Sequence, residues 1–478
     1  MPIAALPSRR ERHVANRFSY GWTPQLSRQI KARGGSAKWF ARQLQVGRLD
    51  DSFQAASFRW WPTLRMTPEQ MWRAQQRGDI GMWEVMEDYR RWCLVRRVQA
   101  VPQVLEVMTE LWENHLHVPA IGEAEAPYRV SYGRGIRQRA LGRYADLLNY
   151  AITHPAMGAY LNNLNSTASS PSEDLGRELL ELHTVGRGVF TETDVKNSAR
   201  ILTGYTGDLW DTWKVGYKPG NHYRGKVKVL GFTHKNTAGD GRPVVRAYLN
   251  YLARHPATAR RVARLLAVRF VSDRPPAALI TKLAKVYRKH DTAIKPVLKA
   301  LFESKAFAAA VDSKVRTPEE DVVATYRVLG YRIHATTGSD SAAEAIVWQA
   351  GDLGLAPFTW PRPDGRPDRG DAWTSTSRML ASFDLHYTMS GGWWPSKGFS
   401  RTTGTAWLPA SKVRFDVLVD HLSRTLTGRR APSWLVTACA QAVKCQPGET
   451  ITADHPVIRW YLPRLLTTVL DQPAHMTR

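Results

Sequence analysis

The chain has 478 residues and a formal net charge of +25, from 67 basic and 42 acidic residues. Its hydrophobic content of 43% and aromatic content of 10% are typical of a globular protein and exclude a disordered chain. No apolar run reaches the ~18 residues of a transmembrane helix. The spacing of Cys93, Cys439 and Cys445 fits neither a disulfide framework nor a zinc site.

The positive charge favours anionic partners: nucleic acid, acidic polysaccharide, a phosphorylated ligand or a membrane surface. The arginines and lysines are scattered, and no nucleic-acid-binding motif is present. We therefore expect no specific nucleic-acid binding. A nonspecific nucleic-acid binder is an alternative, and it predicts one continuous basic face and a salt-dependent affinity.

The N-terminal stretch carries the arginine pair Arg9–Arg10 without an apolar segment after it. It is not a complete secretion signal, so the expected location is the cytoplasm. Export and a different true N-terminus stay open.

Helix starts are well marked in the first hundred residues. Thr23-Pro24 is a cap followed by proline, and Thr67-Pro68 is another, with Gln70 completing a capping box. Residues 83–97 are expected to form one long helix. In the next helix, over residues 101–117, Val104, Met108, Leu111 and His115 repeat at helical spacing, so His115 is expected on the apolar face.

Residues 165–205 form the centre of the prediction. Ser172 is expected to cap a helix that runs to about Val185, and a second helix is expected from Thr191 to Gly204. At ~100° per residue, His183 shares an arc with the leucines of the first helix. Glu178 and Glu181 fall on roughly the opposite side, and Arg177 has the spacing to pair with Glu181.

An inward-facing His183 needs a hydrogen-bond partner. One interpretation is a satisfied core histidine. The other is a pocket histidine that acts as an acid, a base or a ligand. His115 and His183 on neighbouring helices could share a divalent metal, although a metal site wants three or four ligands and the sequence does not identify the others.

Two loop-rich regions interrupt the helices. Residues 207–243 contain Trp210, His222 and one predicted short strand over residues 226–230. Residues 353–395 are rich in proline and contain Trp360, Trp373 and Trp393. Aromatic faces beside polar loops suit sugar rings or other flat ligands, and packing over the core is the alternative.

Several strings resemble one bacterial family, the domain-of-unknown-function 1800 family. Arg177–Gly186 reads RELLELHTVG against the family's RELLELHTLG, and Trp112-Glu113-Asn114-His115 is similar to its FWxNHF. Phe190 stands for the usual Tyr, Tyr205 for the usual Trp, and Ser172-Glu173-Asp174 for the usual NEN. The resemblance extends from about Arg12 to Thr468. It implies uncharacterised activity, and packing of the His115 helix near the His183 helix. Family genes often accompany exported phosphatase- or sulfatase-like proteins (domain of unknown function 1501), which suggests such a partner.

Together these patterns predict a mainly α fold: an orthogonal array of many helices with a few long irregular loops and minor β structure. Residues 12–330 are expected to form the main domain, with residues 331–478 packed on the same core. The leading hypothesis is a pocket for a polar, carbohydrate-like or anionic ligand, with acid–base or metal-assisted hydrolysis. A non-catalytic accessory protein is the alternative. The candidate residues are, for catalysis, His183, His115, Glu178, Glu181 and Arg177; for ligand binding, Asn114, His222, Trp360, Trp373 and Trp393; and for a metal, His115 and His183.

Overall fold

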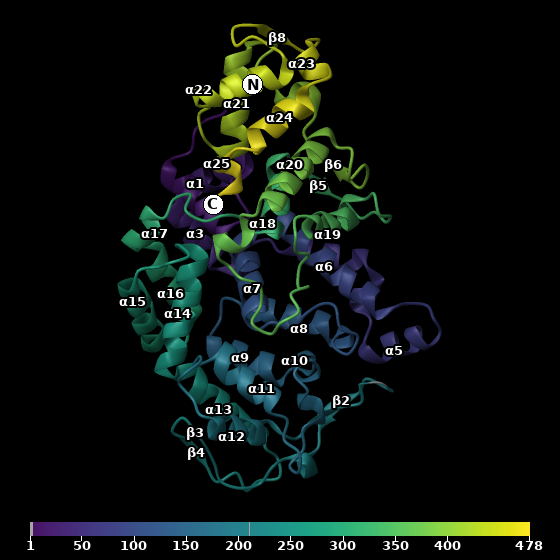
Figure 1. The fold of residues 1–478 in the computed structure, drawn as a ribbon, viewed down its shortest axis with the longest axis vertical. Helices are drawn as coiled ribbons and strands as arrows, with labels where there is room; N and C mark the ends of the chain where they lie inside the picture. Colours follow the sequence, from purple (N-terminus) through teal and green to yellow (C-terminus); the bar gives the residue numbers. More distant parts are fainter. Residues whose placement is uncertain (1–2, 210) are drawn as a thin grey trace.

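The computed structural model describes residues 3–209 and 211–478, so Trp210 of the first loop lies outside it. The predicted mainly α class is confirmed: α-helices dominate, and the β structure consists of short two-stranded sheets (Figure 1). In the part of the chain that is described, no helix is both long enough and apolar enough to span a bilayer.

Figure 1 shows an elongated molecule with α7 and α8 near its middle. The helices α12 and α13 lie towards one end, and α21 to α24 lie at the other. The first ten helices are α1 (Arg9–Phe18), α2 (Pro24–Ala32), α3 (Ser36–Gln43), α4 (Ser52–Ser57), α5 (Pro68–Gln76), α6 (Met82–Gln99), α7 (Gln103–His115), α8 (Ala126–Arg139), α9 (Tyr144–Thr153) and α10 (Pro155–Tyr160).

The middle of the chain contains α11 (Glu173–Glu178), α12 (Glu192–Leu202), α13 (Arg242–Arg254), α14 (Pro256–Phe270), α15 (Ala277–Lys289), α16 (Ile294–Phe302), α17 (Lys305–Ala309) and α18 (Pro318–Val328). The remaining helices are α19 (Ala342–Asp352), α20 (Thr376–Gly391), α21 (Phe415–Thr427), α22 (Ser433–Val443), α23 (Pro456–Arg459), α24 (Leu462–Leu470) and α25 (Pro473–Met476). Short 3₁₀ turns lie at Val46–Arg48, Phe58–Trp60, Pro62–Arg65, Asn163–Asn165, Pro219–Asn221, Gly370–Trp373 and Gly404–Trp407.

The sheets are antiparallel pairs: β1 (Tyr205–Gly207) with β2 (Val215–Tyr217), β3 (Val227–Val229) with β4 (Phe232–His234), β5 (Arg332–Ile333) with β6 (Phe399–Ser400), and β7 (Lys412–Arg414) with β8 (Thr450–Thr452). The strand predicted over residues 226–230 is β3. Leu230 and Gly231 connect it to β4 with φ angles of 51° and 96°. A two-residue hairpin turn of this kind requires positive φ at both positions, which explains the glycine.

Several helix starts follow their capping signals, but Ser172, although it stands at the N-cap position of α11, makes no capping hydrogen bond through its side chain. Thr23 caps α2, and both halves of the Thr67–Gln70 capping box form at α5. The long helix predicted over residues 83–97 is α6. One hydrophobic core runs through the molecule and includes side chains from both predicted segments, such as Leu111 and Leu418.

The helix α7 differs from its prediction. The sequence predicts one apolar face, but every residue of α7 from Gln103 to Glu113 is buried. Glu106, Glu110 and Glu113 therefore lie inside the protein. Because a buried carboxylate is tolerated only when it is paired, α7 needs cations around it.

Candidate functional site

His115 and His183 lie next to each other. Their ring centroids are 6.0 Å apart and their planes meet at 88°. The Nδ1–H of His183 donates to the backbone carbonyl of His115 at 3.0 Å. The Nε2 of His115 is 3.0 Å from the hydroxyl of Tyr144, which itself donates to the backbone carbonyl of His183. A closed circuit of hydrogen bonds therefore joins α7, α9 and the segment that carries His183.

The other ring nitrogen of His183 is left over. Its Nε2 is buried and has no hydrogen-bond partner among residues 3–209 and 211–478. Since Nδ1 carries the proton, Nε2 presents a lone pair. His183 is thus a core histidine with one half of its hydrogen-bonding capacity unused.

A π-helical turn, Leu179–His183, places this histidine. The sequence predicts a helix of regular period to about Val185, but α11 ends at Glu178 and the chain widens by one residue in the next turn. Carbonyls released by the wide turn find new donors: the Thr184 hydroxyl bonds Leu179, and the Arg261 Nε bonds Leu182. Turns of this kind recur at functional sites.

Both histidines are neutral at pH 7. Burial lowers the pKa of His183 to about 4. Burial and the neighbouring His183 lower the pKa of His115 well below its usual value. Desolvation penalises the charged imidazolium, so both rings are neutral hydrogen-bonding groups and only weak bases at pH 7.

The lowered pKa of His183 predicts acid destabilisation. The unfolded chain takes up a proton near pH 6.5 and the folded chain only near pH 4, so stability is complete above pH 6.5 and falls between these values. At 1.36 kcal/mol per pKa unit the loss is about 3 kcal/mol from this side chain. Urea unfolding at several pH values should show a smaller loss for His183→Gln. The exposed His334→Gln is the control, and an equal loss in both variants would contradict the prediction.

Arg177 and Glu181 form ion pairs away from the histidines, whereas Glu178 forms none within the described residues. Arg177 pairs with Glu173 and, across to α12, with Glu192. Glu181 pairs with Arg187 instead of Arg177. Glu178 is partly buried, and burial together with Glu181 raises its pKa. The carboxylates thus stabilise the turn between α11 and α12.

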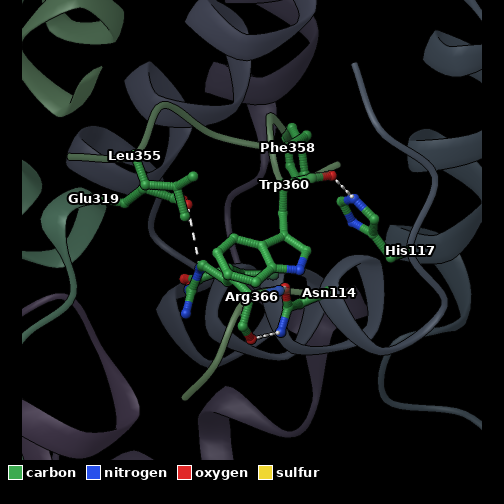
Figure 2. A pocket seen from close by; sticks show the side chains of 8 residues that line it. Asn114, His117, Glu319, Leu355, Phe358, Trp360 and Arg366 are labelled. Atoms are coloured by element: carbon green, nitrogen blue, oxygen red, sulfur yellow. Dashed lines mark hydrogen bonds and ion pairs between the residues drawn. The ribbon is translucent and has the colours of Figure 1, made fainter. Parts of the chain in front are cut away.

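A small cavity lies just beyond His115, between α7, α18 and the loop after α19 (Figure 2). Its volume is about 10 Å³, room for one water molecule. Asn114 and Trp360, both predicted ligand contacts, line it together with His117 and Arg366. The side chain of Asn114 exchanges two hydrogen bonds with the backbone of Arg366, at 2.9 and 2.8 Å. The Nε2 of His117 donates to the backbone carbonyl of Trp360 at 2.8 Å.

The charges around this small cavity are already paired. Arg366 contacts Glu110 and Glu319, and Glu319 also pairs with Arg97. Burial alone would raise the pKa of Glu110, but Arg269, Arg97 and Arg366 lower it to about 2. Arg269 and Arg366 thus supply the cations for Glu110, and among the described residues the charged side chains that line this cavity are paired.

The other three predicted ligand contacts lie elsewhere. His222 is buried, with Nδ1 3.0 Å from the Thr203 carbonyl and Nε2 2.9 Å from Asn236 Oδ1, so it fastens its loop to the end of α12. The indole of Trp373 donates to the Pro367 carbonyl at 3.0 Å. Trp393 is exposed and packs edge-on against Tyr387.

A much larger cavity, about 730 Å³, opens between α2, the end of α6, the end of α18 and the segment around Trp407. Its volume lies in the range of ligand pockets. Its apolar walls include Leu26, Val98, Val328 and Trp407, and the extended segment 3–5 lies along one side.

The cationic side chains of this large cavity are Arg28, Arg327 and Arg332. No aspartate or glutamate is found among the described residues that line it, and none of the three arginines forms an ion pair within the described chain. Arg327 donates to the Val98 carbonyl at 2.9 Å, but its buried Nε has no partner there. Burial, Arg332 and Arg316 lower its pKa to about 10.

Two clusters of three side chains could hold a metal ion among the described residues, and neither includes His115 or His183. One consists of Asp321, His386 and His475, all buried; the other consists of Cys445, Glu449 and His455. Burial opposes a charge on His386, but Asp321 and Asp471 raise its pKa to about 9. Without a metal ion, a proton therefore fills the space between His386 and Asp321.

Sequence analysis misses Asp321, His386, His475 and Arg327. Asp321 follows Glu319 and Glu320 in the first turn of α18, a position where acidic residues ordinarily complement the helix dipole. The two histidines come from segments far away along the chain, so no local spacing connects them. Arg327 is distinguished only by the lack of a carboxylate near it in the described structure, and the sequence around it does not show this.

The fold and these sites define a helical protein with a buried ionic core and a cationic cavity. The chain belongs to the family described as "Protein of unknown function (DUF1800)", whose sequence profile matches residues 13–477. This confirms the resemblance found in the sequence. Searches of curated proteins and of solved structures give no match.

Proposed function

We propose that the protein binds an amphiphilic anion, an apolar chain with one carboxylate or similar head group, in the large cavity. The observation that carries this proposal is that the cavity contains three arginines and, within the described chain, no carboxylate to pair with them. The proposal develops the expectation of an anionic ligand from the sequence and does not include catalysis.

Arg327 is the residue suited to hold the head group. Its guanidinium has donors to spare, because the contact with the Val98 carbonyl uses one of five N–H groups. A partly desolvated guanidinium without a counter-ion gains more from an anion than an exposed one does. Arg332, held by Gln25 at 2.9 Å, stands beside it.

The rest of the cavity suits an apolar chain. Leu26, Val98, Val328 and Trp407 offer aliphatic and aromatic surface, and burial of that surface gives about 25 cal/mol per Å². The segment 3–5 is held in place by a hydrogen bond from the Ala4 backbone to His421 Nδ1 at 3.1 Å. Its residues form part of the cavity wall.

Binding of decanoate, followed by titration calorimetry, tests the proposal. Decanoate is expected to bind, whereas decanol and decylamine, which share its chain, should bind at least ten times more weakly. Arg327→Met should weaken decanoate binding by roughly 10- to 100-fold, the equivalent of a charge-assisted hydrogen bond of about 1.5–3 kcal/mol. The matched control is Arg288→Met on the exposed face of α15. Equal affinity for decanol, or no effect of Arg327→Met, would contradict the proposal.

The histidine pair supports a second candidate, acid–base hydrolysis. The observation in its favour is the buried, unpartnered Nε2 of His183 beside His115. His183 would be the base, and the small cavity at Asn114 and Trp360 would have to widen to admit a substrate. Loss of a base of this kind typically costs 10²–10⁴ in rate. If p-nitrophenyl acetate and p-nitrophenyl phosphate are hydrolysed equally by wild type and His183→Gln, this candidate fails.

A further inference from the structure

We infer that Asp321, His386 and His475 form a binding site for one divalent transition-metal ion of the zinc class. The ligand atoms are Asp321 Oδ1, His386 Nε2 and His475 Nε2, and each lies within 4.8 Å of the others. The three residues come from α18, α20 and α25. Two imidazoles and one carboxylate are a donor set that zinc and iron use in proteins.

The spacing of these atoms fits a tetrahedral ion. With metal–ligand bonds of about 2.0–2.1 Å, neighbouring ligand atoms stand about 3.3 Å apart. His386 Nε2 is 3.2 Å from Asp321 Oδ1, and His475 Nε2 is 3.7 Å from the same oxygen. The Thr325 hydroxyl lies 3.1 Å from His475 Nε2.

Neighbouring side chains orient His386 and Asp321 in the way that the residues around a metal site orient its ligands. The Nδ1 of His386 donates to Asp471 Oδ1 at 2.7 Å, so the carboxylate, the imidazole and the ion would stand in line. The second oxygen of Asp321 accepts bonds from Arg378 at 3.0 Å and from Ser382 at 2.8 Å. Oδ1 is left for the ion, and the negative charges of Asp321 and Asp471 lie beside it, with Arg378 paired to the other oxygen of Asp321.

The second cluster lacks this arrangement. The Nδ1 of His455 accepts the backbone N–H of Val457 at 3.2 Å and caps α23. The Nε2 of a neutral His455 must therefore carry the proton, which it donates to Glu449 at 3.0 Å. A metal ion bound to Nε2 would require the proton to move to Nδ1, which would break the hydrogen bond that caps α23. This cluster therefore provides the control.

The site around Asp321 has a structural role. Its ligands are buried and come from three separate helices, so the free energy of metal binding would add to the stability of the fold. The ion would fasten α25 to α18 and α20, which lie near one another in the upper half of Figure 1.

The metal content of the purified protein tests the inference directly. The full chain, purified without chelator, incubated with zinc sulfate and desalted, should retain a single zinc ion by elemental mass spectrometry. Chelation should lower the melting temperature and zinc should restore it. Cobalt in its place should give the visible absorption bands of a tetrahedral ion. These measurements on wild type do not depend on whether a variant folds.

Variants then assign the ligands. His386→Gln and His475→Gln should lose the zinc, and Asp471→Asn should lower its affinity by about 10- to 100-fold. His455→Gln should retain it. The inference is overturned if wild type retains no zinc, if the first two variants retain it, or if the ion is lost with His455→Gln or with His115→Ala and His183→Ala instead.

Discussion

Arg269→Met is expected to lower the free energy of unfolding by about 3–5 kcal/mol, because it breaks a buried ionic network from one side. Arg269 is almost inaccessible to solvent and contacts three carboxylates: Glu110 at 3.3 Å, Glu320 at 2.9 Å and Asp368 at 3.3 Å. Methionine preserves the unbranched stem of the side chain but not the guanidinium, so the change removes the charge together with its hydrogen bonds. The carboxylates would be left buried with one cation fewer, and urea unfolding should show the loss.

The control for Arg269→Met is an ion pair of similar length at the surface. Arg73 and Glu69 on α5 are 2.7 Å apart, with side chains 68% and 53% exposed. Water and salt screen such a pair, so Arg73→Met should cost less than about 1 kcal/mol. Equal losses in the two variants would show that burial does not increase the dependence of the fold on these charges.

Gly365→Ala is expected to destabilise the fold by about 3 kcal/mol or more, from positive-φ strain and overpacking together. Gly365 has a φ of +71°, and an added Cβ would lie 2.1 Å from the backbone oxygen of Asn114. That contact is with backbone at the end of α7, which has no flexible side chain to move aside. The loop carrying Trp360 and Arg366 would have to withdraw from the small cavity.

Two glycines separate the causes of this effect. Gly188 has a φ of +76° but nothing within 4 Å of an added Cβ, so Gly188→Ala measures the backbone strain alone. Gly220, with neither a positive φ nor a neighbour, gives the baseline. Melting curves should rank Gly365→Ala well below Gly188→Ala. Equal melting temperatures would mean that the loop approaches α7 less closely than described.

Much of the fold could be predicted from the sequence because its signals are local. The caps at Thr23 and Thr67, the long helix α6 and the strand β3 each depend on a few neighbouring residues. The inward position of His115 follows from helical spacing, whereas a π-helical turn that the spacing does not predict places His183. The neighbouring positions of these histidines come from the family resemblance, not from the spacing.

The features that could not be predicted depend on contacts between residues far apart in the chain. The helix α7 carries three glutamates, and pairing with the distant arginines Arg137, Arg129 and Arg366 allows them to be buried. The cluster of Asp321, His386 and His475 forms from three separate helices. The cationic cavity is defined by the lack of carboxylates beside its arginines in the described structure, and no sequence motif indicates such a lack.

The catalytic role of His115, His183, Glu178, Glu181 and Arg177 stays a prediction, as do the phosphatase- or sulfatase-like partner and the cellular location. The nucleic-acid alternative predicts one continuous basic face. Many arginines are instead turned inward, Arg97, Arg129 and Arg269 among them, where they are neutralised by glutamates. The net positive charge therefore belongs to the remaining, outer side chains.

The π-helical turn at Leu179–His183 has a consequence for how the chain tolerates changes in length. A wide turn holds one residue more than an α-helical turn, so deleting a residue between Leu179 and Leu182 would allow α11 to continue with regular geometry. The wide turn and the α-helical turn each complete about one revolution, so the residues after the deletion would keep their orientation about the helix axis, whereas the same deletion in a regular α-helix would rotate them by ~100°. His183 would still face the carbonyl of His115. The wide turn thus gives this helix a position at which its length can change without turning the side chains that follow.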